Sequence, residues 1–155
     1  MRAIAQGANM SVFTRINGTI ASIGGNCQTV AWALLRILSS AMFLTHGYAK
    51  LFGANPQPFL GGMGFFGIDL GVNMLWIAAI IEFFGGILLV LGLFTRPVAL
   101  LAAILMIMAY LTAHRAWFPT LNNGELAAMY FLTYFAIFAY GPGKLSLDAM
   151  LFGRK

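Results

Sequence analysis

Glu82 stands near the middle of a hydrophobic run that is long enough to cross a bilayer. The run extends over residues 72–94, and Glu82 is its only charged residue. A carboxylate at that depth costs roughly 2.5–3.5 kcal/mol even on lenient insertion scales. We therefore expect Glu82 to be protonated, paired or turned toward a polar interior, where it could act as a general acid–base group.

Partners for Glu82 are expected on another apolar segment, which carries Arg36, His46 and Lys50. His46 lies four residues before Lys50 and Arg36 lies two heptads before it, so a helix would place all three along one broad face. Lipid cannot solvate Arg36 or His46, and that face is therefore expected to look into the protein. At ~1.5 Å per helical residue, Glu82 lies about 18 Å from the cytoplasmic side, between Arg36 at about 9 Å and His46 at about 24 Å. We expect a cluster of Glu82 with His46, and with Arg36 or Lys50.

Further polar residues could extend this cluster toward the outer surface; they are His114, Arg115, Glu125, Tyr130 and Tyr134. Taken singly, Lys50, Arg115 and Glu125 fit better as anchors at the membrane interface. His46 and His114 could in principle ligate a haem between helices, but two histidines whose facing is undefined do not favour haem.

Two interpretations of the cluster stay open. In the first, Glu82 and Arg36 form a buried ion pair that only fixes the register of the helices. In the second, Glu82 and His46 are catalytic groups that handle protons or an anion under an apolar lid. Substrate-binding residues would then be Arg36, Lys50, His114, Glu125 and Tyr130. The sequence has no carboxylate-rich metal site, glycine-rich phosphate loop or serine nucleophile motif, so we expect no metal.

The elements that must position these residues are membrane helices. Of the 155 residues, 61% are hydrophobic and only 8% are charged, against about 25% charged in soluble domains. We predict an all-α integral membrane protein, a four-helix bundle with spans at about 30–52, 72–94, 97–118 and 125–140. The net charge of +5 comes from scattered basic residues, which excludes nucleic acid as a partner and leaves the lipid bilayer.

An N-terminal segment, 1–27, precedes the predicted membrane domain, 28–155. It does not fit a signal peptide, because no apolar region of the required length follows Arg2. Its apolar residues recur at helical spacing, which predicts a short helix on the membrane surface that ends at Gly24-Gly25-Asn26; they are Val12, Phe13, Ile16, Ile20 and Ile23. The single cysteine, Cys27, excludes an internal disulfide.

The connections between the spans predict how they are arranged. Residues 53–71 hold six glycines with Phe59, Leu60, Phe65 and Phe66, and are expected to fold back as a lid over one end of the bundle. Thr95-Arg96-Pro97 joins the second and third spans so tightly that they should be antiparallel neighbours, with Thr95 capping the third helix.

Basic residues predict the orientation in the membrane. One side holds Arg2, Arg15, Arg96, Lys144, Arg154 and Lys155; Lys50 and Arg115 lie near the other, beside Asp69 and Glu125. The positive-inside rule then places both termini in the cytoplasm and the glycine-rich loop outside.

Three stretches together form a recognisable pattern. They are Arg36, His46-Gly47 and Lys50 in the first helix, Glu82-Phe-Phe-Gly-Gly-Ile-Leu-Leu-Val-Leu-Gly-Leu-Phe-Thr-Arg96, and the closing Gly141-Pro-Gly-Lys-Leu-Ser-Leu-Asp148. Over about 31–148 the chain resembles the DoxX family of small four-helix membrane proteins. The resemblance implies a multi-pass location in the bacterial inner membrane. Some family members are associated with thiosulfate:quinone oxidoreductases, and others with membrane oxidoreductase complexes that handle thiol or oxidative stress.

The resemblance implies a redox-associated subunit that interacts with quinone or a small sulfur species. A non-enzymatic accessory or assembly subunit of a larger membrane complex is the alternative, and a conduit for a small solute or proton is the third. The chain has no cofactor motif of its own, so quinone is only a candidate cofactor and the question of enzyme activity stays open. Other membrane subunits, or further copies of the chain, are the expected protein partners.

Overall fold

The computed structural model describes residues 2–62, 64, 68 and 71–153, and these residues are built from helices without a strand. The elements are α1 (Arg2–Phe52), α2 (Met74–Ile80), the π-helical turn η1 (Ile81–Gly85), α3 (Gly86–Leu91), α4 (Thr95–Ala113), the 3₁₀ turn η2 (Pro119–Asn122), α5 (Glu125–Tyr140) and α6 (Leu147–Phe152). The predicted all-α class is confirmed. Expectations that rest on Phe65, Phe66, Asp69, Arg154 and Lys155 lie outside the described residues.

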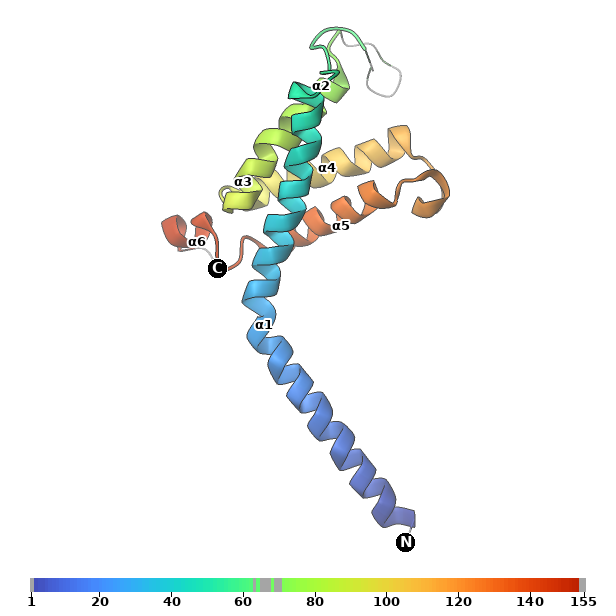
Figure 1. Cartoon of the computed structure of the whole chain (residues 1–155), viewed down its shortest axis with the longest axis vertical. Helices are drawn as coiled ribbons and strands as arrows, with labels where there is room; N and C mark the ends of the chain where they lie inside the picture. Colours follow the sequence, from blue (N-terminus) through green and yellow to red (C-terminus); the bar gives the residue numbers. More distant parts are fainter. Residues whose placement is uncertain (1, 63, 65–67, 69–70, 154–155) are drawn as a thin grey trace.

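Helix α1 corrects the prediction for the N-terminal segment. It is one continuous helix of 51 residues, and Gly24 and Gly25 lie inside it instead of ending it. A glycine lowers helix propensity by only about 1 kcal/mol relative to alanine, which neighbouring helical turns can offset. The segment is therefore helical, but it is not a separate short helix. Figure 1 shows the N-terminal half of α1 projecting away from every other element.

Several helices are apolar and long enough to cross a membrane. They are α1, the run from Met74 to Leu91 that comprises α2, η1 and α3, and α4. The fourth predicted span, α5, is apolar but has only 16 residues. At ~1.5 Å per residue it is about 24 Å long, less than the ~30 Å hydrocarbon core. The described residues thus provide three to four apolar helices able to span a membrane, and the count of four in the bundle stays a prediction.

The helices associate as two antiparallel pairs. Helix α1 packs along α2, η1 and α3, and α4 packs along α5 (Figure 1). Smaller contacts of α4 with η1 and α3, and of α5 with α1, join the pairs. The second and third spans are therefore neighbours, as their short connection requires, but the main partner of α4 is α5.

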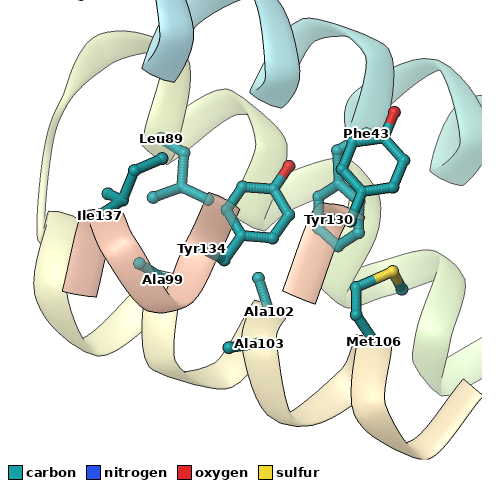
Figure 2. Packing of buried hydrophobic residues seen from close by; sticks show 9 residues of the cluster. All are labelled: Phe43, Leu89, Ala99, Ala102, Ala103, Met106, Tyr130, Tyr134 and Ile137. Carbon is teal, nitrogen blue, oxygen red and sulfur yellow. The ribbon is translucent and has the colours of Figure 1, made fainter. Parts of the chain in front are cut away.

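The hydrophobic core lies where the two pairs meet. Its buried members are Phe43, Leu89, Ala99, Ala102, Ala103, Met106, Tyr130, Tyr134 and Ile137 (Figure 2). The alanines of α4 leave room for α5 to approach closely, as small residues do between membrane helices. The rings of Tyr130 and Tyr134 lie parallel on α5, 5.9 Å apart, and both pack against Phe43 of α1.

The described part of the glycine-rich loop is anchored on the start of α2. The Asn73 side chain caps α2 by accepting from the Leu75 N–H at 3.0 Å, and it donates to the Pro58 carbonyl at 3.0 Å. The Phe59 ring packs edge-on against Trp76. Phe59 and Leu60 nevertheless stay more than half exposed, so these two side chains do not cover the bundle as the lid prediction expected.

Candidate functional site

The Glu82 carboxylate is paired with Lys50. Lys50 Nζ donates to Oε1 at 2.6 Å and to Oε2 at 2.7 Å. The Glu82 side chain is 4% exposed, whereas the Lys50 side chain is 32% exposed. The pair is therefore reached from the Lys50 side. The sequence left Arg36 and Lys50 open as the basic partner of Glu82, and in the structure that partner is Lys50.

A π-helical turn positions Glu82. Glu82 lies in η1, between α2 and α3. A π turn holds more residues than an α turn, so it redirects the face that the following residues present, and such turns are frequent at functional sites. The redirected face includes Gly85 and Gly86, both buried.

Two glycines bring α1 close enough for Lys50 to reach Glu82. A Cβ on Gly47 would overlap the backbone nitrogen of Phe83, and a Cβ on Gly86 would lie 2.7 Å from the Cβ of Leu44. The two helices therefore touch backbone to backbone at these points. Lys50 follows Gly47 by almost one helical turn, which places its ammonium group beside η1.

His46 and Tyr130 flank the ion pair. His46 is exposed on α1, and its ring meets the ring of Tyr130 edge-on, with centroids 6.1 Å apart. Both side chains lie close enough to Glu82 to interact with its charge. Tyr130 is 5% exposed, and its buried hydroxyl has no hydrogen-bond partner among the described residues. Leaving such a group unpaired costs about 1–3 kcal/mol. The site thus combines a carboxylate, an ammonium, an imidazole and a phenol with free hydrogen-bonding capacity.

Arg36 lies apart from this site, because it precedes Lys50 by fourteen residues, about 21 Å along the helix. Its Nη1 donates to the carbonyls of Leu89 at 2.5 Å and Val90 at 2.9 Å, and its Nη2 donates to the carbonyl of Leu145 at 2.6 Å. Arg36 is 1% exposed. The alternative of a Glu82–Arg36 ion pair is therefore wrong, and the arginine instead binds the end of α3 to the segment that follows α5.

His114 and Glu125 also lie apart from the ion pair. His114 follows α4, and its Nδ1 lies 3.0 Å from the carbonyl oxygen of Asn122 in η2. Glu125 is exposed in the first turn of α5, where a negative charge suits the helix dipole. Within the described part of the chain, neither residue forms a hydrogen bond with Glu82, His46 or Lys50.

Sequence reasoning missed a second polar cluster at the opposite end of the helices. Asp148 accepts hydrogen bonds from the backbone N–H groups of Phe94 and Thr95, both at 2.8 Å, and so caps α4 from the other end of the chain. The Thr95 side chain, which was expected to cap α4, forms no capping hydrogen bond, and its buried hydroxyl has no partner in the described chain. We call Arg36, Asp148 and Ser146, with the backbone groups that they bind, the terminal clamp.

The terminal clamp also depends on close packing around Gly92. Gly92 has φ +69°, and a Cβ there would meet Ser146 Cβ at 2.5 Å and Arg36 Nη1 at 2.7 Å. The Asp148 N–H donates to the Gly92 carbonyl at 2.9 Å, and Ser146 caps α6 through the Ala149 N–H. The closing Gly-Pro-Gly…Ser-x-Asp pattern was the available signal, but nothing in it says which helix its aspartate caps.

Comparisons with known proteins identify the family of the chain. The family model described as DoxX matches residues 31–115. A Haemophilus influenzae protein named "Uncharacterized protein" is 41% identical over 125 residues, which cover 77% of this chain and 90% of the relative. "Putative oxidoreductase CatD" of Bacillus subtilis is 34% identical over 123 residues, covering 79% of this chain and 87% of the relative. "Inner membrane protein YqjF" of Escherichia coli is 30% identical over 129 residues, covering 80% of this chain and 94% of the relative.

No solved structure matches the chain significantly. The family model, however, covers more than half of the chain, and each of these relatives is matched over most of its length. The resemblance seen in the sequence is thereby confirmed: the chain belongs to the DoxX family of membrane proteins.

Proposed function

We propose that the protein is a redox-associated subunit of the bacterial inner membrane that exchanges protons with a quinone at Glu82. The observation that carries the proposal is the Glu82–Lys50 pair, which is buried on the carboxylate side and open on the ammonium side. An exposed imidazole and an unpartnered phenol stand beside it. The relative named "Putative oxidoreductase CatD" is consistent with a redox association.

The proposed chemistry divides between this chain and a partner. Reduction of a quinone to a quinol takes two electrons and two protons. The electrons come from a partner subunit, and the protons pass through this chain. His46, at the exposed edge, takes a proton from water and delivers it toward Glu82. The Tyr130 hydroxyl donates a hydrogen bond to a quinone oxygen, and Lys50 balances the negative charge that develops there.

The substitution Glu82→Gln tests this proposal, because it keeps the shape of the side chain and removes its proton-exchanging carboxylate. The complex is purified with its partners in native lipid, and quinone reduction per assembled complex is measured. We expect the rate to fall by about 10²-fold or more, the usual contribution of a general acid–base group. The matched control is Glu125→Gln, an exposed carboxylate on α5, which should leave the rate unchanged. Unchanged quinone reduction by Glu82→Gln contradicts the proposal.

A second candidate function is a non-enzymatic accessory subunit, and it is favoured by the complete pairing of Glu82 with Lys50. On that proposal the pair only holds α1 against η1. The charge-swapped protein Lys50→Glu/Glu82→Lys separates the two functions, because it restores an ion pair but not a carboxylate at position 82. An accessory role predicts that the swap restores both complex yield and activity relative to the single substitutions at positions 50 and 82. A proton-exchange role predicts that it recovers yield while quinone reduction stays low.

A further inference from the structure

The N-terminal half of α1 carries an apolar stripe that no other described element covers. Residues 12–28 are all exposed, and Figure 1 shows this half of the helix standing alone. At ~1.5 Å per residue, the whole of α1 is about 77 Å long, more than twice the ~30 Å hydrocarbon core. A large part of α1 must therefore lie outside the membrane.

The stripe follows a strict heptad pattern. Its residues are spaced alternately by three and four positions: Phe13, Ile16, Ile20, Ile23, Cys27, Val30 and Leu34. The six that are not cysteine are between 50% and 74% exposed, and Cys27 is exposed as well. With Phe13 at position a, every a and d position over three heptads is apolar, which is the seam of a left-handed coiled coil.

Within the chain α1 uses a different face. The residues that α1 buries against its own bundle include Ala33, Arg36, Ser40 and Phe43, whereas Leu34 stays half exposed. The stripe is thus available for another helix without any change in the fold. Residues 12–28 contain three glycines, none of which has a neighbouring atom within 4 Å of an added Cβ, so this part of the helix gains little stability from propensity alone and needs a packing partner.

The absence of charged residues beside the stripe permits an identical helix as its partner. We call residues 12–28 of α1 the arm. Its flanking e and g positions hold Asn17, Thr19, Gly24 and Asn26, none of which is charged. Identical helices can therefore approach without like-charge repulsion across the seam. A helix on the membrane surface would be rich in Lys and Arg, but Arg15 is the only charged residue in 12–28. Such a helix would also have to bend sharply away from the span, and α1 continues without a break.

We propose that residues 13–34 of α1 form a parallel coiled coil with the same segment of further copies of this chain. All copies enter the membrane in one orientation, so their arms leave it on the same side, parallel and in register. β-branched residues at the d positions favour three or more strands over two; they are Ile16, Ile23 and Val30. The proposal does not depend on the quinone site, because it rests on a different part of α1.

Cys27 tests the proposal directly, because it occupies an a position and is the only cysteine in the chain. In a parallel, in-register coiled coil the Cys27 thiols of neighbouring copies face one another. Mild oxidation of native membranes that contain the full chain should therefore yield a disulfide-linked dimer, and Cys27→Ser should abolish it. Single cysteines are then introduced into the Cys27→Ser chain. Ile20→Cys and Ile23→Cys should cross-link efficiently, whereas Ala21→Cys and Gly25→Cys, on the outer face, should cross-link at least tenfold less.

Charge placed in the seam provides the second test. Ile20→Glu should reduce Cys27 cross-linking at least tenfold, and its matched control, Ala21→Glu, should leave cross-linking unchanged. The mass of the detergent-solubilised wild type should correspond to three or more chains. Cross-linking without heptad periodicity points to random collision. A lack of any cross-linking points to an arm that lies on the membrane or binds another protein. Either outcome, or the mass of a single chain, overturns the proposal.

Discussion

At the scale of single residues, the two most buried charged side chains among the described residues have different tasks. Arg36 is enclosed by backbone carbonyls at the end of α3 and after α5, and its Nη1 and Nη2 donors are directed at fixed acceptors. Glu82 is paired with the ammonium of Lys50, and the Lys50 side chain is 32% exposed. A partner on a flexible side chain can be exchanged for a substrate or a proton, whereas a cage of carbonyls cannot. This difference is why Glu82 is the better candidate for chemistry.

Removal of Lys50 should reveal how much the ion pair contributes to stability. Lys50→Met leaves the Glu82 carboxylate buried without a partner, which we expect to destabilise the protein by about 3 kcal/mol, near the low end for broken buried pairs because Lys50 is partly exposed. The double variant Lys50→Met/Glu82→Gln should recover most of the loss. Thermal unfolding in detergent measures both variants. Additive effects of the two substitutions would show that the side chains do not interact.

At the scale of elements, the contact between α1 and η1–α3 is set by glycines rather than by large side chains. Gly47 and Gly86 remove the side chains that would hold the two backbones apart. The π turn then directs Glu82 toward the approaching helix. The site is therefore a product of helix spacing, and its geometry should respond strongly to small changes at these glycines.

The substitution Gly47→Ala should disrupt this spacing. Its Cβ would overlap the backbone of Phe83, and neither backbone can yield without separating the helices. We expect a lower unfolding midpoint together with loss of the Lys50–Glu82 contact. Gly18→Ala is the matched control, because no atom lies within 4 Å of its added Cβ; it should be neutral or stabilise α1 by up to about 1 kcal/mol. Equal midpoints for the two variants would contradict the close approach.

At the scale of the whole molecule, the sequence predicts what depends on local composition and fails where distant segments must meet. Three predicted spans are confirmed as helices able to cross a membrane, because hydropathy is local, and Lys50 was one of two basic partners expected for Glu82 because it shares a helix face with His46. The π turn has no sequence signal of its own. The cap that Asp148 places on α4 joins residues more than 50 positions apart, so helical periodicity says nothing about it. The continuous course of α1 was missed because two adjacent glycines were weighted as a helix end.

Through the terminal clamp, the segment after α5 holds α1, the end of α3 and the start of α4 together. Asp148→Ala leaves the buried N–H groups of Phe94 and Thr95 without their acceptor, which should destabilise the protein by about 1–2 kcal/mol, the upper part of the range for a lost helix cap. Asp148→Asn should cost nearly as much, because an amide oxygen can replace only one of the two acceptor oxygens. Met150→Ala, an exposed side chain two residues away, is the control and should change little. Thermal unfolding in detergent compares the three variants.

Since the Glu82–Lys50 pair lies at the other end of the helices, an Asp148→Ala protein that remains folded should keep its quinone reduction rate. A selective loss of that rate would place Asp148 in the proposed site.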